Sequence, residues 1–175
     1  IAATAINLWG SNAPLYINNS AASSITGTIS NARLTKDGSG TLTLSGNNTY
    51  SGTTTISGGT LSISSNNNLG STPGVVTVNS IVLNGGTLLA SSDMTLNSLR
   101  GISLGSNGGG LGVDSGRTLT YAGIIANASG ATGSLTKSGA GTLILSGANT
   151  YSGGTIISAG TLSISSDANL GAVPG

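Results

Sequence analysis

The chain has 175 residues, of which 99 are Gly, Ser, Thr or Asn, and its formal net charge is +1. It contains no His and no Cys, which excludes imidazole bases, thiol nucleophiles, disulfides and the common zinc ligands, so we expect no metal and no other cofactor. Five Lys and Arg residues are too few for a surface that binds nucleic acid or anionic lipid.

Aliphatic residues are frequent enough for a folded core. Leu, Ile and Val supply 41 residues along the chain, whereas a disordered linker usually has fewer aliphatic residues and a larger net charge. The abundance of Thr and Ile favours strands, and the composition of a helical protein is absent. We therefore expect an all-β protein with one continuous domain over residues 1–175.

Short segments with period-two alternation follow one another along the chain. In each segment Leu or Ile alternates with Thr or Ser, which places the aliphatic side chains on one face of a strand and the hydroxyl groups on the other. Clusters of Gly, Asn and Ser, which favour turns, bound the segments. The clearest examples are residues 41–45, 60–64, 118–121 and 161–165.

Two long segments are nearly the same. Residues 34–74 and 135–175 align without gaps at an offset of 101 residues, and 30 of the 41 aligned positions are identical. Weaker matches, such as residues 102–107 with 6–12, extend the repeat on its N-terminal side. We expect the chain to be a window of a longer array of such repeats.

A shorter repeat lies inside the long one. Gly-Thr-Leu recurs at spacings from 19 to about 30 residues, which indicates one coil for roughly every 20 residues, with loops of variable length. We therefore predict a right-handed parallel β-helix (β-solenoid) of about 8–9 coils, on the order of 40 Å long. A β-sandwich is the alternative, but parallel stacking of like strands explains the repetition directly. The repeat positions that we expect to build the coils are Gly40, Thr41, Leu42, Leu44, Tyr50, Gly59, Leu61, Ile63, Gly141, Leu143, Leu145, Tyr151, Gly160, Leu162 and Ile164.

Residues 34–64 and 135–165 resemble a known repeat family. Both contain Leu-x-Lys-x-Gly-x-Gly-Thr-Leu-x-Leu-Ser-Gly, then Asn-Thr-Tyr-Ser-Gly, then Gly-Thr-Leu-x-Ile. This order is similar to the passenger-associated transport repeat of autotransporter passenger domains and of related giant bacterial surface proteins. The resemblance implies a β-helical passenger that is displayed extracellularly, at the bacterial cell surface, and it fixes no particular activity.

The predicted coil with its unpaired edges, together with the resemblance, implies partners. Neighbouring coils of the same protein, or identical subunits stacked end to end, would cover the ends of the helix. An outer-membrane β-barrel would lie outside this segment, and a host or glycan ligand is left open. We expect no nucleic-acid partner.

Few residues could carry chemistry. The four Asp residues could pair as catalytic carboxylates, but Asp37 aligns with Ser138 and Asp167 with Asn66, which favours turn positions. Residues 109–116 resemble one calcium-binding nonapeptide without a tandem copy, and a glycine-rich loop between coils is the preferred interpretation. We predict no enzymatic activity.

Three further residue types have alternative interpretations. The paired Lys36 and Lys137 either mark a ligand site or are exposed charges that discourage edge association, and we prefer the second. Tyr50 and Tyr151 either stack on glycans or anchor a loop onto the coil, and we prefer the anchor. Trp9, the sole Trp, is expected to pack locally or at a contact between chains.

Three functional hypotheses follow from the sequence. The first is a structural shaft that spaces other modules from the membrane and that, as the resemblance implies, aids export. The second is a fibre subunit that stacks end to end through unpaired strand edges. The third is an adhesive module that binds glycans or cells through its Thr, Ser and Asn face.

Overall fold

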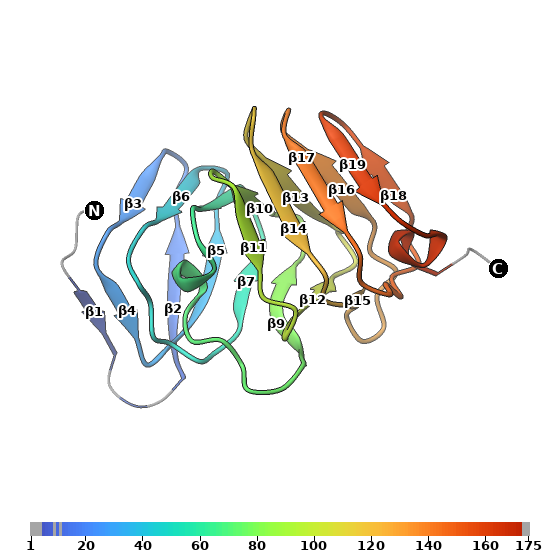
Figure 1. Cartoon of the computed structure of the whole chain (residues 1–175). Coiled ribbons are helices and arrows are strands. Elements are labelled where there is room, and N and C mark those ends of the chain that lie inside the picture. Colours follow the sequence, from blue (N-terminus) through green and yellow to red (C-terminus); the bar gives the residue numbers. More distant parts are fainter. Residues whose placement is uncertain (1–4, 9, 11, 173–175) are drawn as a thin grey trace.

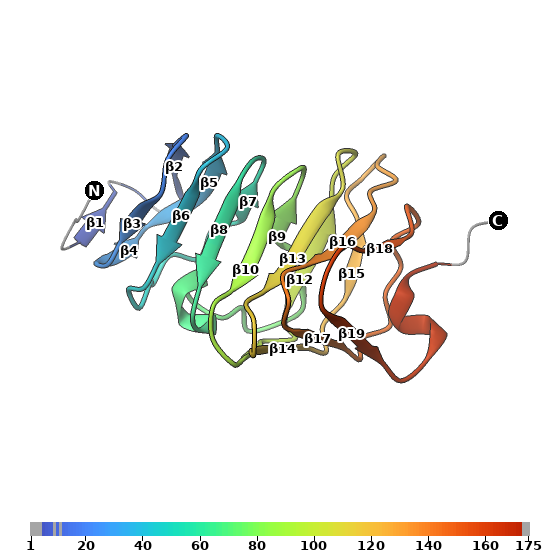
Figure 2. The same cartoon turned by 90° about the horizontal axis from the view of Figure 1, so that it is seen from above.

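The computed structural model describes residues 5–8, 10 and 12–172, and these form a parallel β-helix. Every strand pair in this part of the chain is parallel, and successive coils lie side by side from the N-terminal to the C-terminal end (Figure 1). Figure 2 shows the strands of one face stacked along the axis of the coil. The parallel β-helix predicted from the sequence is confirmed. Trp9 lies outside the described residues.

The coil has three faces, which the chain visits in a fixed order. Face 1 consists of a two-stranded and a four-stranded sheet, with β1 (Ala5–Asn7), β4 (Thr28–Ser30), β11 (Met94–Leu96), β14 (Thr118–Tyr121), β17 (Thr142–Leu145) and β19 (Thr161–Ile164). Face 2 is a six-stranded sheet of β2 (Ala13–Asn18), β5 (Ala32–Asp37), β7 (Thr54–Ile56), β9 (Thr77–Leu83), β12 (Arg100–Leu104) and β15 (Ile125–Asn127). Face 3 is a seven-stranded sheet of β3 (Ser23–Ile25), β6 (Thr41–Leu44), β8 (Thr60–Ile63), β10 (Thr87–Ala90), β13 (Gly109–Val113), β16 (Leu135–Ser138) and β18 (Thr155–Ile157).

Irregular segments bridge the two sheets of face 1. Thr49 N donates to Ile29 O at 2.9 Å, and Ser71 N donates to Tyr50 O at 2.8 Å, so backbone hydrogen bonds continue along this face without strands. The 3₁₀ helix η1 (Asn66–Leu69) lies here, and η2 (Asp167–Leu170) follows β19 near the C-terminal end. Within the described residues, no helix is long and apolar enough to cross a membrane.

The described residues make about seven turns, fewer than the eight or nine that we expected. The reason is that coil length varies. The register Thr41–Thr60 spans 19 residues, whereas the register Thr60–Thr87 spans 27. The extra residues form η1 and the loop that leads into β9.

The core is a set of aliphatic columns inside the coil. Leu42, Leu61, Leu88 and Leu111 occupy one register on face 3, and each is at most 1% exposed. On β6, Thr41 and Thr43 alternate with the buried Leu residues and are less buried, as the period-two pattern predicts. Because a fully buried Leu contributes about 1.5–3 kcal/mol relative to an exposed one, the stacked columns are the main source of stability.

The two long repeats lie on different faces. In the first repeat β5 lies on face 2 and β6 on face 3, whereas the matching strands β16 and β17 of the second repeat lie on faces 3 and 1. The path from β5 to β16 makes four full turns and one additional face. The second repeat is therefore turned by one face relative to the first.

The glycine-rich segment at 109–116 is mostly a strand, so the expected loop is wrong. Residues Gly109–Val113 form β13, and all five are buried. A Cβ atom on Gly109 would lie 2.2 Å from the Leu83 Cβ, and one on Gly110 would lie 2.4 Å from the Thr87 Oγ1. Glycine is required here because side chains of the preceding coil fill the space that a side chain would need.

Candidate functional site

The Gly-Thr-Leu units begin strands at the corners of the coil. Gly40 and Gly141 pack against the preceding coil, where an added Cβ would lie 2.3 Å from Ala21 O and 2.2 Å from Asp114 O. The Leu and Ile residues that follow are buried on the strands β6, β8 and β17. On β19, Leu162 is half-buried and Ile164 is 38% exposed, because no described coil covers that strand.

Lys36 and Lys137 are buried inside the coil, so the expected exposed charge is wrong. Both side chains are 0% exposed, and each occupies an aliphatic column, Lys36 opposite Ile56 and Lys137 opposite Leu111. Each Nζ reaches a corner, where it donates to three backbone carbonyl groups. The acceptors are Asp37 O at 2.7 Å, Gly38 O at 2.9 Å and Gly58 O at 3.2 Å for Lys36, and Ser138 O at 2.7 Å, Gly139 O at 2.7 Å and Ala159 O at 3.1 Å for Lys137.

These ammonium groups tie successive coils together. Two of the three acceptors follow the lysine in its own coil, and the third belongs to the next coil. Burial lowers the pKa of Lys36 and of Lys137 below the ordinary lysine value, and Asp37 partly opposes this shift at Lys36. The carbonyl oxygens replace the water that the ammonium groups lose on burial.

The repeated tyrosines anchor the irregular segments of the coil. Tyr50 is 1% exposed and its hydroxyl lies 2.8 Å from the Thr54 Oγ1, and Tyr151 is 0% exposed and lies 2.5 Å from the Thr155 Oγ1. Burial raises the pKa of Tyr50 to about 12 and raises that of Tyr151. Since neither ring is accessible, the structure favours the anchor over glycan stacking.

Near each repeat, two buried asparagines form hydrogen bonds with backbone groups at the same corner of the coil. Asn48 accepts from Ile29 N at 2.8 Å and donates to Asn68 O at 2.6 Å, and Asn149 makes the matching bonds with Ile125 N and Asn169 O. The Asn68 Oδ1 in turn accepts from two backbone N–H groups that precede η1. These amides satisfy buried backbone groups where the ladder of strands is interrupted.

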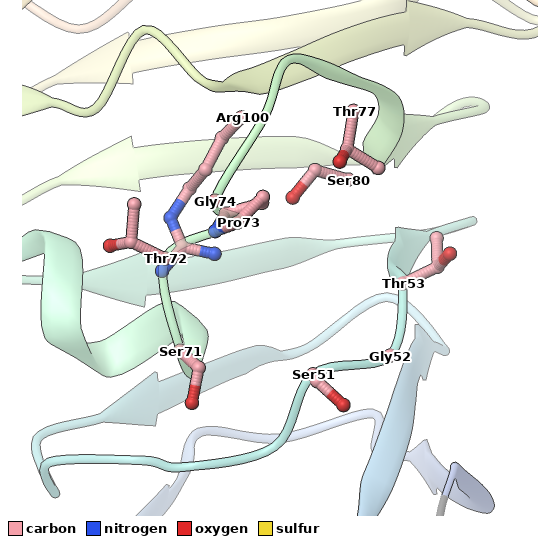
Figure 3. Close-up of a pocket in the computed structure, with 10 residues that line it drawn as sticks. All are labelled: Ser51, Gly52, Thr53, Ser71, Thr72, Pro73, Gly74, Thr77, Ser80 and Arg100. Carbon is pink, nitrogen blue, oxygen red and sulfur yellow. The ribbon is translucent and has the colours of Figure 1, made fainter.

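The surface is hollowed beside η1, at the longest coil. A pocket of about 280 Å³ lies between the loop after η1 and the preceding coil (Figure 3). Its lining is short and polar, and consists of Ser51, Gly52, Thr53, Ser71, Thr72, Pro73, Gly74, Thr77, Ser80 and Arg100. No aromatic or acidic side chain lines it.

Arg100 is the one charged residue of this lining. Its side chain is 2% exposed, and it donates to the Asn66 Oδ1 at 3.0 Å, to Leu69 O at 3.0 Å and to Gly70 O at 2.5 Å. Burial lowers its pKa, and Tyr50 partly opposes that shift. Among the described residues the ion pair within 4 Å is Arg117–Asp93, so Arg100 has no carboxylate partner there.

The comparisons with known proteins identify the repeated framework. The family model of the passenger-associated-transport-repeat matches residues 34–63 and 135–164. The chain carries two passenger-associated transport repeats. These matches cover most of β5, all of β6 to β8 and all of β16 to β19, together with the buried lysines, the tyrosines Tyr50 and Tyr151, and the asparagines Asn48 and Asn149.

A curated relative has a similar segment. The adhesin BmaC autotransporter of Brucella suis biovar 1 (strain 1330) is 42% identical over 94 residues. The similarity covers 53% of this chain and 3% of that protein, so the chain spans a small part of the relative's length. No solved structure matches the chain.

The four Asp residues lie at strand ends and turns around the transport repeats. Asp37 ends β5, Asp114 follows β13, and Asp167 begins η2. Asp93 accepts from Thr118 N at 2.7 Å and pairs with Arg117 at 3.7 Å. In the described part of the chain, no three side chains of the types His, Cys, Asp or Glu come together as metal ligands.

Sequence reasoning missed Arg100, which lies between the two transport repeats. A signal was present, because Arg100, Ile102 and Leu104 alternate at period two, which places the arginine on the inward face of its strand. The buried asparagines were also missed. They appear in the sequence only as polar residues of a turn-rich stretch.

Proposed function

We propose that this chain is part of a stiff shaft in a protein that is secreted or displayed at the bacterial cell surface. The observation that supports it is the stack of about seven parallel coils around one core of aliphatic and tyrosine side chains. At about 4.8 Å per coil, such a stack rises about 30 Å. The match to an autotransporter and the two transport repeats support the location.

The mechanical role follows from the direction of the hydrogen bonds. In a parallel β-helix the backbone bonds between coils run along the axis, so bending or stretching the shaft must break them in groups. Lys36 and Asn48 add side-chain bonds between coils, which stiffen the corners. We expect the chain to space other modules and to have no enzymatic activity.

The same stacking offers a way to aid export. Each new coil adds to an edge that the preceding coil has already formed, so folding can proceed coil by coil from one end. Ile157 and Ile164 are 55% and 38% exposed on the last described coil, at the register positions that the next coil covers elsewhere. We propose that further coils of a longer array cover them.

Changing the number of repeats in the parent protein tests this role. Inserting tandem copies of residues 64–164 joins Ile164 to Ser64 in the native repeat sequence, and each copy adds about 20 Å of shaft. We expect surface display to be retained, and the distance of a terminal epitope from the membrane to grow with copy number. A distance that does not change with copy number would refute the shaft.

End-to-end fibre assembly is the second candidate, and the exposed apolar edge of the last described coil favours it. Analytical ultracentrifugation of the chain distinguishes the two. Linear oligomers that Ile157→Asp abolishes would favour the fibre, whereas a monomer at all concentrations would exclude it.

A further inference from the structure

We propose that the pocket beside η1 binds the carboxylate of a small acidic sugar, with Arg100 as the residue that contacts the anion. This inference goes beyond the shaft and does not depend on it. The segment 51–53 of the lining belongs to the first transport repeat, whereas the loop 71–77, Ser80 and Arg100 lie in the stretch between the two matched segments.

The first support is an uncompensated buried charge. Arg100 is 2% exposed, and within the described residues no carboxylate lies at ion-pairing distance from it. Carbonyl oxygens satisfy part of the guanidinium group but carry no formal charge. Because a buried cation without a counter-charge is costly, a bound anion would be favoured at this position.

The second support is the number of free donors. A guanidinium group has five N–H donors, and three hydrogen bonds from Arg100 engage Asn66, Leu69 and Gly70. That leaves two N–H groups, one on each terminal nitrogen, without a partner in the described part of the chain. Each of these N–H groups can donate a charge-assisted hydrogen bond to a carboxylate oxygen.

The third support is the lining. Figure 3 shows the guanidinium group and the Ser80 hydroxyl directed toward the space between the segments 51–53 and 71–77. The hydroxyl groups of Ser51, Thr53 and Ser80 have no side-chain hydrogen bond among the described residues, so they can bond to sugar hydroxyls. No acidic residue in the lining repels an anion, and no aromatic platform favours a neutral apolar ligand.

The size of the pocket limits the ligand. About 280 Å³ lies at the lower end of the range of small-molecule pockets, which suits a single sugar ring rather than a long chain held in full. A terminal or branching acidic residue of a glycan would meet this limit. The ligand class is therefore a uronic acid or a similar carboxylated monosaccharide.

Binding is tested on the whole chain with sodium galacturonate as the probe and galactose as its neutral counterpart. We expect saturable shifts of the Gly70, Thr72 and Ser80 amide signals in NMR spectra, with a Kd of about 1 mM or tighter, and no binding of galactose. Equal binding of the two sugars would overturn the proposal that the pocket recognises the carboxylate. If inorganic sulfate bound as tightly as galacturonate, the proposal that the pocket recognises a sugar would be overturned.

Two variants and one matched control separate the site from general charge effects. Arg100→Gln should weaken galacturonate binding about tenfold or more, and Arg117→Gln, which removes the same charge from an exposed pair, should leave it unchanged. Equal losses in both variants would overturn the site.

The second variant guards against a folding defect. Ser80→Leu fills the pocket without removing a hydrogen bond of Arg100, so it should abolish binding while the amide signals of η1 stay in place. Retained binding in a folded Ser80→Leu protein would place the anion elsewhere and overturn the proposal.

Discussion

The two transport repeats share most of their sequence and the same side-chain hydrogen bonds, yet within the described residues only the first is covered on both sides. Leu61 and Ile63 of the first repeat are at most 1% exposed, whereas the matching Leu162 is half-buried and Ile164 is 38% exposed. The difference comes from β10, which covers β8, while β19 is an edge of its sheet. How deeply a repeat position is buried therefore depends on whether another coil stacks on it.

The side-chain hydrogen bonds show the opposite behaviour. Lys137, Asn149 and Tyr151 make the same bonds as Lys36, Asn48 and Tyr50, although the second repeat lies one face further round the coil. These bonds reach no further than the following corner. The repeat motif therefore determines the hydrogen bonds at the corners, whereas stacking of the next coil determines how deeply the core side chains are buried.

Truncating the shared Leu should give the largest difference between the repeats. We expect Leu61→Ala to lower the free energy of unfolding by about 2–5 kcal/mol, because it opens a cavity between two coils. Leu162→Ala should cost clearly less, since one side of that residue is already uncovered. Urea unfolding measures both, and equal losses would contradict the role assigned to the covering coil.

Removing the buried ammonium group should have the next largest effect. Lys36→Met keeps the length of the side chain but leaves Gly38 O and Gly58 O without their donor, so we expect a loss of about 1–3 kcal/mol. Lys137→Met is the matched variant at the uncovered end and should lose less, because Ala159 is exposed to water. An unchanged midpoint for Lys36→Met would show that the carbonyl groups need no donor.

Alkaline pH should weaken both repeats through their tyrosines. The pKa of Tyr50 rises from 10.0 to about 12 on folding, so above pH 10 the unfolded state loses the proton that the folded state retains. Stability is therefore complete below pH 10 and falls as pH rises toward about 12, by up to about 1.4 kcal/mol per pH unit for each such tyrosine. Tyr50→Phe should be less stable at neutral pH and show a shallower alkaline decline in thermal unfolding. An identical slope would contradict the shift.

Exchanging an exposed residue between the repeats should have the smallest effect. Asp37→Ser introduces the residue found at position 138 and removes no side-chain hydrogen bond to the described residues, so we expect a change within about 0.5 kcal/mol. Thermal unfolding at two salt concentrations checks it. A larger loss would show that the carboxylate stabilises its corner.

The sequence was sufficient for the strands and for their parallel stacking. Both follow from local alternation and from the recurrence of Gly-Thr-Leu, and each strand that begins with this unit pairs in register with another. The number of coils could not be counted in the same way. The stretch between Thr60 and Thr87 is a single coil with a long corner. From its length alone it could equally be one complete coil followed by part of a second.

The buried cations show where pattern reasoning stops. Ala32, Leu34 and Lys36 occupy alternate, inward-facing positions of β5, so the sequence pattern alone could have placed Lys36 on the inner face. The pattern could not show that Gly58, 22 residues later, supplies a carbonyl oxygen for the buried ammonium group. The same holds for Arg100, whose partners lie 30 to 34 residues earlier. A charge can be assigned to the interior only when the distant carbonyl groups that receive it are known.

The step of one face between the repeats has a geometric consequence for any longer array. If every further repeat kept the same path of four turns and one face, identical surface features would follow a helical path around the shaft. Features in neighbouring copies would then point in three different directions, and the fourth copy would face the same way as the first. A rod of this kind would offer its surface to all sides, even though each repeat is asymmetric.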